Sequence, residues 1–307
     1  MKNKITSLLW VGISALVLVL ISGFVFTFEG FTALKSYGEE PSYKVYALEL
    51  PDSLSFAGEI VPLHSPDLKE RLDRELLVNT YWQSNMMLLL KRANKYFPTI
   101  EKILKEEGVP TDLKYLSVIE SGLENVISPA GAKGFWQIMR TTGREYGLEV
   151  NSNVDERYHI VSSTRMAAQY LKKAKDKFGS WTLAAASYNR GMSGIQRNLN
   201  AQEVESYFDL LLGKETSRYV FRILAVKEII ENPSKYGYVF DNTDLYYSVP
   251  VRYHGLDTAI SNLTSFAQKM GINYKILKIH NPWLLQNHLN NKSRKYYEIA
   301  IPEKGYY

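Results

Sequence analysis

Hydrophobic residues recur at helical spacing through the middle of the chain. The pair Ser65 and Pro66 is typical of a helix start, and apolar residues then continue at intervals of three and four over residues 71–90. Further helices are predicted over residues 98–107, with Pro98 in the first turn, 111–122, 163–179, 180–188 and from Thr216 onward. Strand-like alternation is absent from residues 111–231. The pattern therefore predicts a mainly α domain over residues 65–232.

The pattern changes after Asn232 and Pro233. Residues 246–251 and 297–301 are expected to form strands, the second stopped by Pro302. Residues 256–270 and 274–280 between them are expected to form short helices. Residues 233–307 are therefore predicted to be a small α+β module with the order β-α-α-β.

The N-terminal 28 residues differ from everything that follows. Lys2 and Lys4 precede an uncharged, apolar stretch over residues 5–28. At about 1.5 Å per residue this stretch reaches roughly 36 Å, enough for a transmembrane helix. It is longer than the apolar part of a cleavable signal, which favours a membrane anchor with the rest of the chain facing the periplasm or the cell exterior. Cleavage to a periplasmic protein is the alternative.

Residues 29–64 are predicted to be a linker or arm, because they hold Pro41, Pro51 and Pro62 and lack sustained periodicity.

Composition excludes several kinds of chemistry. The chain has no cysteine, so it has no disulfide, no cysteine-ligated metal, no cysteine nucleophile and no lipid-modified N-terminal cysteine. Its five histidines are scattered, and we expect neither a metal nor an organic cofactor. The net charge of +5 suits an anionic polymer as partner, but the basic residues form no stripe and nucleic acid is not expected.

Glu120 is the candidate catalytic residue. It shares a helix face with Leu113 and Leu116, and the other faces of that helix are apolar as well. A carboxyl group at the end of such a helix is expected to be partly desolvated, which raises its pKa. A protonated carboxylic acid can donate the proton that a glycosidic oxygen needs in order to leave.

Two later segments offer surfaces suited to a sugar. The small-residue loop over residues 128–134 lets the backbone approach a ligand closely, and Trp136 and Gln137 follow it with a flat ring and an amide. Tyr188 and Asn189 lie at a predicted helix end just before Gly191. Taken singly, each of these segments is also typical of core packing or of a turn.

Taken together, residues 110–230 resemble the soluble-lytic-transglycosylase domain, of the membrane-bound transglycosylase D type. The resemblance rests on four blocks in order, at residues 120–122, 131–137, 186–191 and 215–220, and residues 153–157 also fit. It implies a lysozyme-like helical catalytic domain that cleaves the bond between N-acetylmuramic acid and N-acetylglucosamine in peptidoglycan glycan strands. It implies that the 6-hydroxyl of muramic acid attacks, leaving a 1,6-anhydro end.

The resemblance also assigns roles to residues. Glu120 would be the catalytic acid and then base, and Ser121 would support the site. Gln137 would bind an N-acetyl sugar, beside the aromatic surface of Trp136. The cleft would be lined by Tyr188, Asn189 and Tyr219. Arg190 stands where the family usually has a small residue, so it would narrow the cleft or contact an anionic peptide stem.

Other interpretations stay open. Glu124 is the nearest candidate for a second carboxylate, and Asp155 and Glu156 lie in a separate segment. None is evidently placed opposite Glu120, which suits a substrate-assisted route. A lysozyme-type hydrolase and a non-catalytic wall-binding protein remain alternatives. The C-terminal module more weakly resembles a lysin-motif domain, which implies binding to polymers that contain N-acetylglucosamine. The sequence leaves the oligomeric state open.

Overall fold

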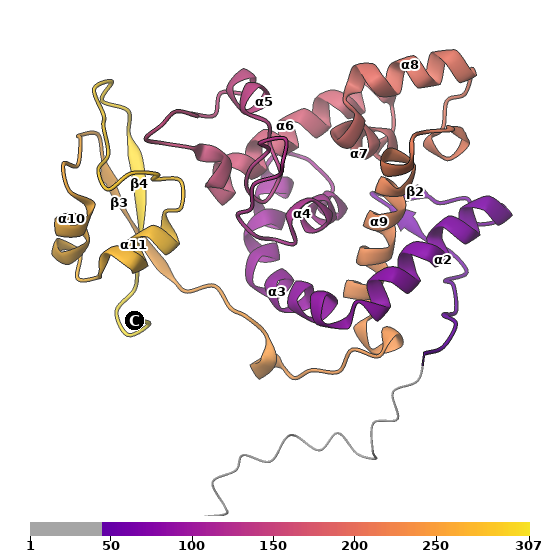
Figure 1. Ribbon diagram of the computed structural model, residues 1–307, viewed down its shortest axis with the longest axis horizontal. Coiled ribbons are helices and arrows are strands. Elements are labelled where there is room, and N and C mark those ends of the chain that lie inside the picture. The colour runs from indigo at the N-terminus through magenta and orange to yellow at the C-terminus, as the bar shows by residue number, and fades with distance from the viewer. Residues whose placement is uncertain (1–44) are drawn as a thin grey trace, which may run out of the picture. The chain divides into compact units, whose positions relative to one another are not determined.

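The computed structural model describes residues 45–307, of which Ala47–Tyr307 form one compact unit (Figure 1). The unit opens with a short antiparallel hairpin, β1 (Ser55–Phe56) and β2 (Glu59–Ile60). This hairpin lies within the stretch predicted to be a linker or arm. Phe56 is buried in the main hydrophobic core, and Glu59 accepts hydrogen bonds from the Ser180 hydroxyl at 2.8 Å and the Thr182 amide at 2.9 Å.

The main core lies among helices, as the hydrophobic pattern predicts. The α-helices are α2 (Pro66–Tyr81), α3 (Gln83–Glu106), α4 (Lys114–Ser121), α5 (Arg140–Glu145), α6 (Ile160–Phe178), α7 (Trp181–Arg190), α8 (Met192–Gln202) and α9 (Lys214–Glu231). Short 3₁₀ turns lie at Thr111–Leu113, Glu156–Tyr158, Tyr207–Asp209, Pro233–Tyr236 and Asn242–Asp244. Helix α9 packs against α2, α4 and α7, so it contacts most of the elements that carry the candidate site.

Three helix ends follow from local chemistry. Gly122 and Gly179 end α4 and α6 in the left-handed conformation, with φ of 63° and 68°, which glycine adopts without steric strain. Ser180 begins α7 and accepts a hydrogen bond from the Leu183 amide. The predicted start of α6 at Ser163 is wrong: the helix begins after His159, whose ring accepts from the Ser162 amide.

The predicted helix start at Pro98 is also wrong, because Pro98 lies inside α3. Ala93, Phe97, Ile100 and Leu104 keep one buried face on both sides of the proline, and this packing offsets the one backbone hydrogen bond that proline removes. The break between helices falls at Trp82 instead.

The C-terminal module has its own hydrophobic core and the predicted β-α-α-β order. It consists of β3 (Val251–Leu256), α10 (Leu263–Lys269), α11 (Tyr274–His280) and β4 (Tyr297–Pro302), and β3 pairs with β4 antiparallel. The last helix and strand match their predictions closely. The first strand was predicted five residues too early. The first helix was predicted to begin seven residues too early, but its predicted end agrees within one residue.

No helix within residues 45–307 is long and apolar enough to cross a membrane. The predicted anchor over residues 5–28 lies outside the described residues.

Candidate active site

Glu120 occupies the last turn of α4. Tyr115, Leu116 and Val118 on the same short helix are buried, so the helix is fixed in the core and its end is set at the edge of that core. The Glu120 side chain is only partly exposed. Burial raises the pKa of Glu120 to about 6, against the opposing effects of a hydrogen bond from Tyr219 and the positive charge of Arg222. The carboxyl group can therefore hold a proton near neutral pH.

Tyr219 holds one oxygen of that carboxyl group. Its hydroxyl donates to Glu120 Oε1 at 2.5 Å from the neighbouring helix α9. Burial, followed by the negative charge of Glu120, raises the pKa of Tyr219 well above its usual value. The pKa of Tyr188 is also raised well above its usual value, by burial and then by the negative charge of Glu120. The Tyr188 hydroxyl donates to the Trp136 carbonyl at 2.8 Å. Both phenols therefore stay neutral and keep their protons as donors.

Ser121 joins the end of α4 to the loop that follows. Its hydroxyl lies 3.0 Å from the Ser117 carbonyl oxygen and 2.9 Å from that of Phe135. The sequence-predicted role of supporting the site is consistent with this contact, because the Phe135 carbonyl belongs to the loop that carries Gln137.

That loop is folded tightly over residues 127–138. Lys133 forms isolated bridges with both Ile127 and Ile138. Gln137 has a left-handed backbone with φ of 45°, and its Nε2 donates to the Gly134 carbonyl at 2.8 Å and the Val126 carbonyl at 3.2 Å. The side-chain nitrogen of Gln137 is thus used within the loop, which leaves the amide oxygen for a ligand.

Asn189 ties the end of α7 to the start of α9. Its Oδ1 accepts from the Thr216 hydroxyl at 2.8 Å, and its Nδ2 donates to Glu215 Oε1 at 3.4 Å. Glu215 is four residues before Tyr219, on the same face of α9. Its negative charge raises the pKa of Glu120, but it is the smallest of the causes.

Trp136 does not present its ring at a surface. The side chain is fully buried, and its Nε1 donates to the Thr164 hydroxyl at 2.9 Å. The structure thus places Trp136 in the core beneath the loop, where no ring face is exposed to a sugar. Trp136 contacts Tyr188 in two ways: the Tyr188 hydroxyl donates to the Trp136 carbonyl, and the two ring centres lie 6.4 Å apart in an edge-on arrangement.

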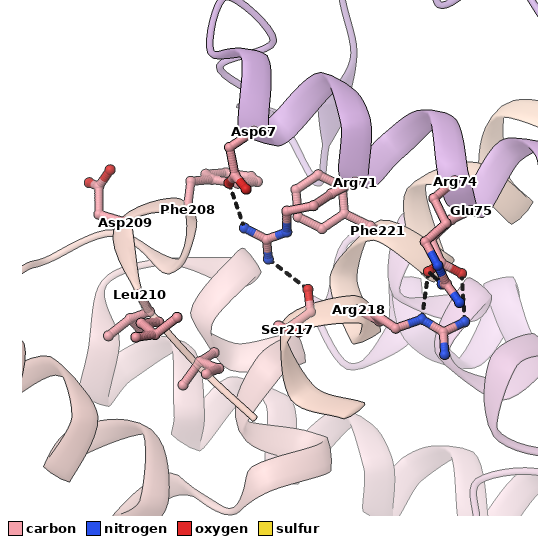
Figure 2. Close-up of a pocket in the computed structure, with 12 residues that line it drawn as sticks. Asp67, Arg71, Arg74, Glu75, Phe208, Asp209, Leu210, Ser217, Arg218 and Phe221 are labelled. Atoms are coloured by element: carbon pink, nitrogen blue, oxygen red, sulfur yellow. Dashed lines mark hydrogen bonds and ion pairs between the residues drawn. The ribbon is translucent and has the colours of Figure 1, made fainter. Parts of the chain in front are cut away.

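A second set of contacts, between α2 and α9, fixes the position of α9. Figure 2 shows these contacts beside a pocket of about 370 Å³. Buried Glu75 on α2 accepts two hydrogen bonds from Arg218, at 2.6 and 3.1 Å, and it also pairs with Arg74. Arg71 donates to the Ser217 carbonyl at 2.7 Å and lies 4.3 Å from the Phe221 ring centre. Because Ser217 and Arg218 directly precede Tyr219, this clamp between α2 and α9 sets the position of the tyrosine.

The C-terminal module is joined to the loop of the candidate site. Val154 is buried in the core of the module and bridges to Leu284, and the Asp155 amide donates to the Trp283 carbonyl at 3.0 Å. The Asp155 carboxylate binds Arg157 at 2.7 and 2.8 Å. Arg157 in turn donates to two carbonyl groups of the loop, those of Gly131 and Ile138, at 3.2 Å each.

The residues predicted from sequence are thus brought together from α4, the following loop, α7 and α9, with the exception of the Trp136 ring. Sequence reasoning missed Arg222, which lowers the pKa of Glu120, and the contribution of Glu215. Helical spacing was the available signal, since Glu215 and Arg222 lie four residues before and three residues after Tyr219. The brace made by Asp155 and Arg157 had only a motif signal, because residues 153–157 fit the family resemblance but do not reveal this contact.

Other nearby acids serve elsewhere. Glu124 pairs with Arg92 at 2.7 Å, and Asp155 is buried between Arg157 and Lys133. Among the carboxylates that the structure describes, Glu215 is the one whose charge acts on Glu120.

Comparison with known families identifies both parts of the chain. Residues 97–209 match the transglycosylase SLT domain, and residues 252–305 match the soluble lytic transglycosylase C-terminal LysM-like domain. The chain therefore carries an SLT transglycosylase domain followed by a LysM-like domain.

The chain is homologous to membrane-bound lytic murein transglycosylase D of Escherichia coli (strain K12), with 29% identity over 262 residues. The same protein from Escherichia coli O6:H1 matches equally. The match covers 82% of this chain and 56% of each relative, so the chain spans little more than half the length of these relatives. The X-ray structure of an inactive mutant of lytic transglycosylase Slt from Pseudomonas aeruginosa aligns with a TM-score of 0.36 and 21% identity, over 50% of this chain and 26% of that one.

Proposed function

We propose that this protein is a peptidoglycan lytic transglycosylase with a lysozyme-like catalytic domain. It cleaves the bond between N-acetylmuramic acid and N-acetylglucosamine and leaves a 1,6-anhydro end. The observation that carries the proposal is a single carboxyl group, Glu120, with a pKa raised to about 6 and a tyrosine hydroxyl bound to it. The SLT domain match and the names of the relatives support the substrate.

Glu120 acts twice in this reaction. As an acid it gives its proton to the glycosidic oxygen, and the bond from that oxygen to the muramic acid C1 breaks. The resulting carboxylate then takes the proton of the muramic acid 6-hydroxyl while that oxygen bonds to C1. The proton count closes, because Glu120 ends protonated and no water is consumed.

The other residues of the site bind and orient. Tyr219 holds the carboxyl group, and Ser121 fixes the loop against α4. Gln137 offers its amide oxygen to an N-acetyl nitrogen, and Tyr188 and Asn189 line the cleft. The Trp136 ring is buried in the core, so Trp136 anchors the loop and does not contact the sugar.

Two further parts of the proposal concern the membrane anchor and the C-terminal module. Residues 5–28 anchor the protein in a membrane, with the catalytic domain on the periplasmic or outer side. The C-terminal module binds polymers that contain N-acetylglucosamine; the LysM-like domain match supports this role.

A lysozyme-type hydrolase is the alternative to a lytic transglycosylase, and the position of Glu215 favours it. Glu215 is a carboxylate whose charge reaches Glu120, and a second carboxylate is what a hydrolase uses to guide water or to form a covalent intermediate. Glu215 is exposed and its effect is the smallest of the causes, which supports the substrate-assisted route.

Replacing Glu120 tests the proposal against a non-catalytic wall-binding role. Glu120→Gln keeps the shape of the side chain but has no proton to donate, so release of soluble fragments from purified peptidoglycan falls by at least about a hundredfold. Glu124→Gln is the matched control, because Glu124 is one turn away and paired with Arg92. A Glu120→Gln protein as active as the parent would refute the assignment.

A further inference from the structure

A pocket of about 530 Å³ adjoins the candidate site. Gln137 and Tyr188, two of the proposed cleft residues, line it together with residues of α5, α6 and α8. Tyr188 lies close enough to Glu120 for the charge of the carboxylate to raise its pKa. The pocket therefore shares Gln137 and Tyr188 with the candidate site.

Three cations line this pocket: Lys173 on α6, Arg190 at the end of α7 and Arg197 on α8. All three are exposed, and none forms an ion pair with any residue that the structure describes. Lys173 lies 6.0 Å from the Tyr146 ring centre. One carboxylate, Glu145, also lines the pocket, so the cations outnumber the acids by three to one.

The pocket shown in Figure 2 differs from this one in how its cations are paired. It too is lined by three arginines, but Arg71, Arg74 and Arg218 are each paired with Asp67 or Glu75. Those cations neutralise carboxylates of the fold and hold α2 against α9. Lys173, Arg190 and Arg197 have no such partner within residues 45–307, so their charge is available to attract an anion.

Gly194 makes room for Arg190. A Cβ at Gly194 would lie 2.9 Å from Arg190 Cγ, so the arginine side chain lies directly over this glycine on α8. Gly194 and Arg197 are three residues apart and therefore neighbours on one face of α8. Arg190 and Arg197 therefore both line the pocket beside α8, and an arginine guanidinium binds a carboxylate through charge-assisted hydrogen bonds.

We propose that Lys173, Arg190 and Arg197 form a subsite for the free carboxylates of the peptide stem that branches from the muramic acid. This inference rests on the proposed function and names a determinant of substrate choice. The occupant follows from continuity, since a pocket that begins at Gln137 and Tyr188 is reached by a branch of the same glycan strand. The attraction is electrostatic, so it weakens as salt is added.

Three substrates separate charge from bulk. They are soluble glycan strands with free stem carboxylates, the same strands with those carboxylates converted to amides, and strands stripped of stems by an amidase. The full chain and its variants Lys173→Ala, Arg190→Ala and Arg197→Ala are compared by kcat/KM on each. Lys172→Ala is the matched control, because Lys172 is exposed on the same helix and lines no such pocket.

The wild type is expected to prefer the free-carboxylate strands. Each pocket variant reduces the ratio of kcat/KM on free-carboxylate strands to that on amidated strands by about threefold to tenfold. Arg190→Lys restores part of the ratio, and Lys172→Ala leaves it unchanged. Thermal melting of each variant shows whether the fold is kept.

The outcomes separate the two claims. A wild type that cleaves none of the three substrates contradicts the proposed function. A wild type that cleaves them with equal kcat/KM, or pocket variants that keep the wild-type ratio, overturns the subsite while leaving the proposed function standing.

Discussion

The Tyr219 hydroxyl donates a 2.5 Å hydrogen bond to Glu120 Oε1 and so joins α9 to the last turn of α4. This bond lowers the pKa of Glu120, while burial raises it and is the larger effect. The proton on Glu120 thus depends on a balance that single substitutions can shift in either direction.

Tyr219→Phe removes the hydrogen bond and leaves the burial. The pKa of Glu120 then rises above about 6, so the acid form persists to higher pH and the alkaline limb of the kcat/KM profile moves upward. Arg222→Met moves it in the same direction, and Glu215→Gln moves it downward because it removes a negative charge. Tyr236→Phe serves as control, because the Tyr236 hydroxyl donates to Glu228 and not to Glu120. A limb that stays in place in all three variants would mean that Glu120 is not the titrating acid.

Glu120→Gln is expected to stabilise the protein at neutral pH. The pKa of Glu120 is raised from 4.5 in the reference state to about 6 in the fold, so ionisation destabilises the fold as pH rises through this window. Above pH 6 the penalty is at most about 2 kcal/mol, and the neutral amide avoids it. Urea unfolding at pH 7 and at pH 4 measures this difference. The gain should be present at pH 7 and vanish at pH 4; an equal gain at both would show that ionisation is not its cause.

Glu75→Ala should destabilise the fold strongly. Glu75 is 1% exposed and neutralises Arg218 and Arg74, so its removal leaves cations without a partner at the contact of α2 and α9. The expected loss is about 3 kcal/mol in the free energy of unfolding. Asp67→Ala removes an exposed partner of Arg71 and should cost less than about 1 kcal/mol. Similar losses for both would argue against the clamp.

Gly134→Ala should disrupt the loop of the candidate site. Gly134 has φ of 78°, and an added Cβ would lie 2.0 Å from the Arg157 carbonyl oxygen, which is backbone and cannot move aside freely. Gly131→Ala has a similar φ of 85° but nothing within 4 Å, so it incurs only the backbone strain of about 1–2 kcal/mol. Activity and melting temperature should fall much further for Gly134→Ala, and equal behaviour of the two would contradict the close approach.

The helices around the site could be predicted because their signals are local. Gly122, Gly179 and Ser180 act on the backbone within one turn, and each ends or begins a helix as expected. Pro98 misled the prediction, since a buried face that continues on both sides of it depends on packing from distant segments. The strand Val251–Leu256 was misplaced because its register is set by its partner strand Tyr297–Pro302.

In the candidate site, too, features with local signals could be predicted and features set by distant contacts could not. Glu120 could be proposed from its helix face and from family motifs. The hydrogen bond from Tyr219 and the brace from Asp155 to Arg157 join segments far apart in sequence, so only the fold reveals their geometry. The burial of Trp136 is of this kind too, because an aromatic residue beside a glycine-rich loop reads equally well as surface or core.

Mass spectrometry of the fragments released from purified peptidoglycan tests the central claim most directly. If Glu120 takes the proton from the substrate's own 6-hydroxyl, the fragments carry 1,6-anhydro-muramic acid ends, one water lighter than hydrolysed ones. Reducing muramic acid ends would contradict the account and make water the attacking group.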